Sequence, residues 1–148
     1  MHYSEAVTIA DLREIARKKL PRSVFGFLDG GAHDERTLRD NEDDFGRLRF
    51  APRFMIDVSQ RSQSVTVLGD TFKSPMILGP TGLAGVFWPD GDIAVARASE
   101  KTGIGFCQST NSNCSIEQVA SRGHKHFWFQ LYVQKDRGFS RSIGRAHV

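Results

Sequence analysis

The sequence has 148 residues, of which 39% are hydrophobic and 25% charged, and this composition excludes a chain that is disordered throughout. Lys and Arg number 20 against 17 Asp and Glu, and the basic residues are scattered, so the net charge of +3 does not indicate a nucleic-acid-binding surface. The apolar runs are far shorter than the roughly 20 residues of a membrane-spanning helix, and residues 1–7 lack the apolar core of a signal peptide. The expected compartment is the cytoplasm.

The cysteines and histidines do not form a metal-binding pattern. Cys107 and Cys114 are seven positions apart, a spacing that fits neither a CxxC site nor a disulfide framework. His124 and His126 are the only histidines that lie close together, and no cysteine or carboxylate stands at a useful spacing from them. The sequence therefore predicts free, buried thiols and no metal site.

The first third of the sequence is predicted to be helical. Thr8 is a suitable N-cap for a helix that runs towards Pro21, because three apolar residues recur at helical spacing between them: Leu12, Ile15 and Ala16. The highly charged residues 33–44 predict a further, solvated helix.

A short helix is expected between these two, from Pro21 to Gly30-Gly31. Proline suits a first helical turn, and glycine is frequent where a helix ends. The apolar side chains of this helix are expected to be buried against something larger: Val24, Phe25, Phe27 and Leu28.

A β-hairpin is predicted next. Val65 and Val67 alternate with polar residues, Gly69-Asp70 is a turn signal, and a second short run extends through Phe72.

The remaining residues alternate between strand and helix patterns. Residues 76–78, 104–107 and 127–133 are short apolar runs that predict strands. The helices between and after them are marked by cap signals: Asp92 to Gly103, a Ser115/Gln118 capping box with an end at Gly123, and Asp136 onwards. Strands separated by helical crossovers form a parallel sheet, either doubly wound or closed as a barrel, and the periodicity does not decide between the two.

Polar or flexible residues follow each predicted strand. Residues 79–82 carry two glycines and a proline that let the main chain approach a flat cofactor closely, and Ser109 follows the second strand. Gln130 and Tyr132 are two apart in the third strand, so their side chains are expected to project the same way. Because ligands bind at the carboxyl ends of parallel strands, these residues predict a cofactor site. No GxGxxG or GxxxxGK[ST] motif is present, so a dinucleotide or P-loop site has no support.

Four segments resemble the FMN-dependent 2-hydroxy-acid dehydrogenases and oxidases, the family of lactate and mandelate dehydrogenases and glycolate oxidase. They are residues 20–32 with FLDGGA, 77–82 with ILGPTG, 109–110, and 128–133 with WFQLYV. The resemblance covers essentially the whole chain in the right order. It implies an α/β fold, namely the N-terminal part of a (β/α)8 TIM barrel preceded by short helices and a hairpin. Residues 1–148 would then be one truncated portion of the FMN domain, since such a barrel typically needs about 250 residues.

The resemblance also implies roles for residues in the chain. Pro80, Thr81 and Gly82 would run along the edge of the FMN isoalloxazine ring, and Ser109 and Gln130 would bond its polar edge. Tyr132 would hydrogen-bond the hydroxyl of a small 2-hydroxy acid, or the alkoxide that develops as hydride leaves.

Two departures from the family pattern limit these expectations. Phe27 stands where many members have a tyrosine that binds the substrate carboxylate. The proton-abstracting histidine, its aspartate, the carboxylate-binding arginines and a lysine near the flavin lie, in this family, on strands and loops beyond residue 148.

Three hypotheses follow. The first is FMN-dependent oxidation of a 2-hydroxy acid to a 2-oxo acid, with the given chain lacking the catalytic base. The second is a non-catalytic remnant or interaction fragment, and the third is another FMN-binding barrel enzyme. For a full-length enzyme, the first hypothesis is compatible with a homo-oligomer and with peripheral attachment to the inner membrane.

Overall fold

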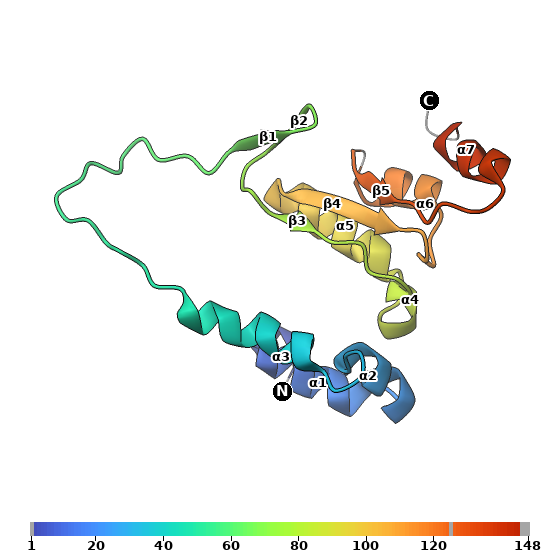
Figure 1. The fold of residues 1–148 in the computed structure, drawn as a ribbon, viewed down its shortest axis with the longest axis horizontal. Coiled ribbons are helices and arrows are strands. Elements are labelled where there is room, and N and C mark those ends of the chain that lie inside the picture. Colours follow the sequence, from blue (N-terminus) through green and yellow to red (C-terminus); the bar gives the residue numbers. More distant parts are fainter. Residues whose placement is uncertain (1, 125, 146–148) are drawn as a thin grey trace. The chain divides into compact units, whose positions relative to one another are not determined.

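The computed structural model describes residues 2–124 and 126–145, and the chain divides into two compact units, Met1–Gln60 and Arg61–Val148. The first unit contains α1 (Ile9–Lys19), α2 (Arg22–Asp29) and α3 (Arg36–Asp43), with 3-10 turns at Tyr3–Glu5 and Asp44–Arg47 (Figure 1). All three helices were predicted, whereas the 3-10 turns were not.

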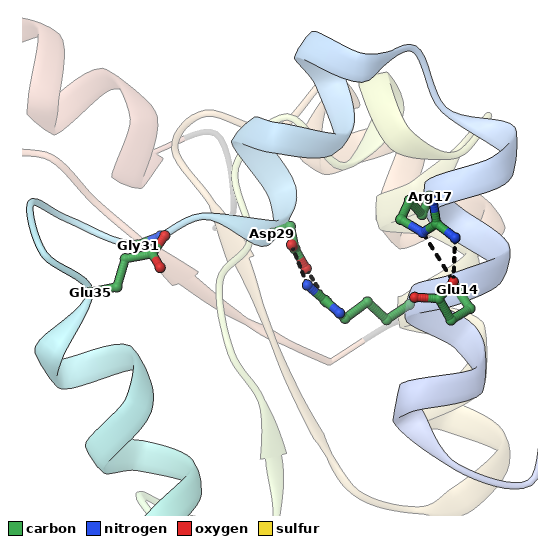
Figure 2. Close-up of polar contacts among 6 residues, drawn as sticks. Glu14, Arg17, Asp29, Gly31 and Glu35 are labelled. Atoms are coloured by element: carbon green, nitrogen blue, oxygen red, sulfur yellow. Dashed lines mark hydrogen bonds and ion pairs between the residues drawn. The ribbon is translucent and has the colours of Figure 1, made fainter.

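Short-range polar contacts fix the ends of these helices. The predicted cap at Thr8 is confirmed, because the Asp11 N–H donates to Thr8 Oγ1 at 3.2 Å and the Thr8 N–H donates to Asp11 Oδ2 at 2.9 Å. The end of α2 is tied to α1, since Arg13 Nη2 donates to Asp29 Oδ2 at 2.7 Å and this hydrogen bond lowers the pKa of Asp29. Figure 2 shows this contact at Asp29 and, beyond α2, the Glu35 carboxylate that accepts the Gly31 N–H at 3.0 Å.

The apolar side chains of α2 are less buried than the sequence predicts. Val24 and Phe25 are half-buried, while Phe27 is 68% and Leu28 45% exposed. Among the described residues of the first unit, Ile15 alone is buried. Helices of 8 to 11 residues, one of them (RTLRDNED) with five charged residues out of eight, have too little apolar surface to enclose one another.

The second unit begins with the predicted hairpin. β1 (Val65–Val67) pairs antiparallel with β2 (Asp70–Phe72). Leu68 and Gly69 form the two-residue connection with φ values of 52° and 92°. Positive φ at both positions is the geometry of the type I′ turn, whose twist matches that of the strands.

A parallel three-stranded sheet follows, with the order β3-β4-β5. β3 spans Ile77–Leu78, β4 spans Gly105–Ser109 and β5 spans Trp128–Gln130. The three strands were predicted, but β4 extends two residues further than expected and β5 ends three residues earlier.

Four helices accompany the sheet: α4 (Ala84–Phe87), α5 (Gly91–Thr102), α6 (Ile116–Arg122) and α7 (Arg137–Arg145). The predicted stop at Gly103 is confirmed by its left-handed φ of 73°. The Ser115/Gln118 capping box is also confirmed, as is the start of α7 at Asp136, whose carboxylate accepts the Gly138 N–H at 2.8 Å. The short α4 was not predicted, and residues 146–148, where α7 was expected to continue, lie outside the described residues.

The prediction that Asp92 caps α5 is wrong. The N-cap is Asp90, with a φ of 52°, and α5 starts at Gly91. A Cβ on Gly91 would lie 2.6 Å from the Ala84 carbonyl oxygen, so this close approach turns the chain into the helix earlier than the cap signal suggests. Asp92 therefore falls in the first turn, where it is 3% exposed.

The order β3-β4-β5 occurs both in a barrel and in one half of a doubly wound sheet, so strand order alone does not decide between the alternatives that periodicity left open. Because β3, β4 and β5 lie in chain order, both right-handed crossovers move in one direction and carry α5 and α6 to the same face, as Figure 1 shows. The core lies on this face and consists of four buried residues: Ile93, Ala96, Phe106 and Val119. None of the described helices is long and apolar enough to cross a membrane.

Replacing Val119 by alanine should lower the free energy of unfolding by about 2–3 kcal/mol, since two buried methyl groups are lost and a cavity is left in the core. Val119 is fully buried on α6, whereas Val95 on α5 is 37% exposed and provides a matched control. Val95→Ala should change stability by less than about 0.5 kcal/mol. Denaturant titration of the folded protein measures both. Equal effects would contradict the assignment of the core.

A polypeptide of residues 1–148 produced by itself should self-associate. β3 and β5 are the outer strands of the described sheet, and each presents main-chain groups without a neighbouring strand. Size-exclusion chromatography with light scattering is the measurement. A single monomeric peak together with a cooperative melting transition would contradict this expectation.

Candidate functional site

The carboxyl ends of β4 and β5 place two of the predicted site residues opposite each other. Ser109 is the last residue of β4 and pairs in register with Gln130, the last residue of β5. Ser109 is 4% exposed and Gln130 is half-buried. The structure thus brings these two residues together at the strand ends.

The loop after β3 lies beside the carboxyl end of β4. The Leu83 N–H donates to the Asn111 carbonyl oxygen at 2.9 Å, which joins this loop to the one after β4. A Cβ on Gly82 would lie 3.2 Å from Asn111 Cβ and 3.8 Å from Ser109 Oγ. Glycine at position 82 therefore allows the Pro80-Thr81-Gly82 segment to lie directly beside Ser109.

Thr110 links the ends of β4 and β5. Its N–H donates to Gln130 Oε1 at 3.3 Å and its hydroxyl donates to the Gln130 carbonyl oxygen. The same hydroxyl accepts the Tyr132 N–H at 3.0 Å. Thr110 stood in the polar segment noted in the sequence, but no role was predicted for it, because the contacts that define its role come from residues 20 and 22 positions away.

Tyr132 lies beyond the strand in which the sequence placed it. β5 ends at Gln130, so strand alternation does not govern the direction of the Tyr132 side chain. The residue is 55% exposed. Its main chain is held at the strand ends by Thr110, and its phenol is accessible from solvent.

The groups at these strand ends match the needs of a flavin ring. The Gln130 amide nitrogen and the main-chain N–H groups of Thr81 and Gly82 have no hydrogen-bond partner among residues 2–124 and 126–145. The Ser109 oxygen accepts the Asn111 N–H at 3.1 Å, which leaves its hydroxyl proton free to be donated. Donors from three neighbouring strand ends suit the carbonyl and nitrogen acceptors along the edge of an isoalloxazine ring, so the residues present fit FMN.

Phe27 is not among the residues that the second unit brings together. It lies on α2 of the first unit, where Arg13 binds Asp29 at the end of the helix and Glu35 accepts the Gly31 N–H beyond it.

The two thiols are free and half-buried. Burial raises the pKa of both Cys107 and Cys114, and for Cys114 the negative charge of Asp92 adds to this effect. Both thiols are therefore protonated near neutral pH. No group of three or more His, Cys, Asp or Glu side chains within the described ranges is arranged to hold a metal ion.

Curated relatives match most of this chain. The chain is 47% identical over 125 residues to an (S)-mandelate dehydrogenase of Pseudomonas putida, and the match covers 84% of this chain and 32% of that protein. It is 44% identical over 133 residues to an L-lactate dehydrogenase of Pseudomonas syringae pv. syringae, covering 90% and 35%. The chain therefore spans about a third of the length of these relatives.

Solved structures agree with the fold. A soluble mutant of the membrane-associated (S)-mandelate dehydrogenase from Pseudomonas putida superposes with a TM-score of 0.84 at 44% identity, over 94% of this chain and 40% of that one. A structure described as the monotopic membrane protein (S)-mandelate dehydrogenase gives a TM-score of 0.86 at 40% identity, over 97% and 38%. The α/β fold seen here is accordingly the N-terminal part of a TIM barrel, as predicted. The family model described as FMN-dependent dehydrogenase matches residues 16–147, and the chain belongs to this family.

Proposed function

We propose that the protein containing this chain oxidises a small 2-hydroxy acid, of the lactate or mandelate kind, to the 2-oxo acid with FMN as cofactor. The observation that carries this proposal is the convergence of Gly82, Ser109 and Gln130 at one edge of the β3-β4-β5 sheet, with Tyr132 tied to the same edge. The names of the relatives, (S)-mandelate dehydrogenase and L-lactate dehydrogenase, support the substrate class.

Each of these residues has a separate task. Bound FMN supplies the acceptor for the hydride that leaves the substrate carbon. We assign the ring edge to the main chain of Pro80, Thr81 and Gly82, and the ring's polar atoms to Ser109 and Gln130. Buried or half-buried donors of this kind hold a flat ring in one orientation and cost no reorganisation during the reaction.

Tyr132 is assigned to the substrate. Its phenol donates a hydrogen bond to the oxygen of the substrate hydroxyl, which becomes more negative as the proton is removed and hydride leaves. The group that accepts the hydroxyl proton is assigned to barrel strands outside residues 1–148, in line with the family pattern. Tyr132 thus acts by electrostatic stabilisation and not as the base.

The location and assembly of the enzyme form a separate proposal. We propose a cytoplasmic protein that attaches peripherally to the inner membrane and assembles as a homo-oligomer. The relative described as a monotopic membrane protein supports the attachment.

Flavin spectroscopy with turnover assays tests the proposed function. The full-length protein should carry about one FMN per chain and oxidise lactate or mandelate. A polypeptide of residues 1–148 alone should bind no FMN and show no turnover. It contains three strands of a barrel that needs eight. A full-length protein without flavin would favour the interaction-fragment hypothesis, and a flavoprotein inactive on all 2-hydroxy acids would favour another barrel enzyme.

Tyr132→Phe in the full-length enzyme should lower kcat more than it raises KM. The lost hydrogen bond strengthens as negative charge builds, and a bond to a charged group is worth about 1.5–3 kcal/mol. Steady-state kinetics on lactate and mandelate measures the two constants. A raised KM with unchanged kcat would assign Tyr132 to ground-state binding instead.

Phe27→Tyr in the full-length enzyme should lower KM for small 2-hydroxy acids. If Phe27 occupies the position of the family's carboxylate-binding tyrosine, a phenol there would supply a donor to the substrate carboxylate, worth about 1.5–3 kcal/mol. The exposure of Phe27 leaves room for a hydroxyl without burying it. KM and melting temperature should be measured on the same variant, with Phe45→Tyr as control, because Phe45 is similarly exposed at 76% in the first unit. A lower melting temperature with unaltered KM would mean that Phe27 serves packing only.

A further inference from the structure

Thr110 occupies the point at which β4 and β5 separate. Beyond the last pair, Ser109 with Gln130, the β4 chain turns, since the Ser112 N–H donates to the Ser109 carbonyl oxygen at 3.1 Å. The β5 chain runs on through Leu131 to Tyr132. The two strands therefore part where the proposed flavin and substrate groups are located.

The Thr110 side chain takes the place of its own main chain in the sheet. In a parallel ladder continued by one residue, Thr110 would stand opposite Leu131. Its N–H would then bond the Gln130 carbonyl oxygen, and its carbonyl oxygen would accept the Tyr132 N–H. The Thr110 hydroxyl makes both of these bonds instead.

Because the hydroxyl makes these two bonds, the main-chain N–H of Thr110 is available for another partner. That N–H donates to Gln130 Oε1 at 3.3 Å, so the amide group of Gln130 is held with its nitrogen free. Thr110 is itself half-buried, and the hydroxyl has one donor and one acceptor bond, which fixes its orientation. One residue thus sets the main chain of Tyr132 and both the main chain and the side chain of Gln130.

We propose that Thr110 is a positioning residue for the flavin and substrate site, acting through Gln130 and Tyr132 without touching either ligand. This inference rests on the proposed function. It adds a residue that determines how accurately the β5 end presents the Gln130 amide to the flavin and the Tyr132 phenol to the substrate. A shift of this end by a fraction of an ångström is enough to weaken both contacts.

The test compares variants of the FMN-loaded full-length protein at position 110. Thr110→Val keeps the shape of the side chain and removes the hydroxyl, while Thr110→Ser keeps the hydroxyl. The valine variant should lose about tenfold in kcat and about tenfold in FMN affinity, the factor expected when one hydrogen bond is lost. FMN affinity is read from the quenching of flavin fluorescence. The serine variant should stay within about twofold of the unchanged protein in both.

Ser99→Ala is the matched control, because Ser99 is a fully buried hydroxyl that donates to the Ala96 carbonyl oxygen at 3.0 Å within α5. It should lower the melting temperature and leave kcat and FMN affinity unchanged. Should Thr110→Val not fold, Thr110→Ala and Thr110→Ser differ by the hydroxyl alone and give the same comparison.

A double-mutant cycle with Tyr132→Phe separates positioning from general stability. If Thr110 acts through Tyr132, the pair Thr110→Val/Tyr132→Phe should lose less kcat than the product of the two single losses. Additive losses, or a serine variant as impaired as the valine one, would overturn the proposal. If the unmodified full-length protein carried no flavin and showed no turnover, the proposed function would be overturned instead. In that case, Thr110→Val and Thr110→Ser with the same melting temperature would also overturn the role of the hydroxyl.

Discussion

Ser109 and Gln130 form the last residue pair of the β4–β5 ladder, and the rest of the site depends on this register. A slip by one residue would turn every side chain of β5 to the opposite face of the sheet and remove the Gln130 amide from the strand ends. The register is fixed on the other face by the core, in which Phe106 of β4 and Val119 of α6 are buried and Phe127 packs against them. Apolar packing on one face thus determines which polar groups meet at the carboxyl edge.

The elements that the sequence predicts well are those fixed by neighbours in the chain. The caps at Thr8 and Ser115 and the left-handed Gly103 involve residues at most five positions apart, so their signals are complete within a short window. Strand periodicity likewise predicted the hairpin and the three parallel strands. Strand order was beyond the reach of periodicity, because it depends on which strands pair across the intervening helices.

The failures have the opposite origin. β5 is shorter than its apolar run because its partner strand turns away after Ser109, and Asp92 is not a cap because Gly91 packs on Ala84. The amphipathic pattern of α2 predicted that its apolar side chains are buried, yet Phe27 is exposed. Such a pattern shows that one face of a helix is apolar, but it does not show what covers that face. Of the site, the residues at the three strand ends were predicted from position and family resemblance, whereas the contacts of Thr110 required the structure.

The separation of β4 and β5 also explains why a side-chain hydroxyl is needed at this position. A ligand site at the end of parallel strands requires neighbouring chains to diverge, and divergence leaves main-chain groups without their ladder partners. Water could satisfy these groups, but it would not hold the strand end in a single position. A threonine in the first residue after the ladder donates and accepts at once, with a stiff χ1. Thr110 therefore holds the β5 end as far as Tyr132 while the β4 chain turns away and bonds Leu83 through Asn111, so the opening of the site and its rigidity arise from the same residue.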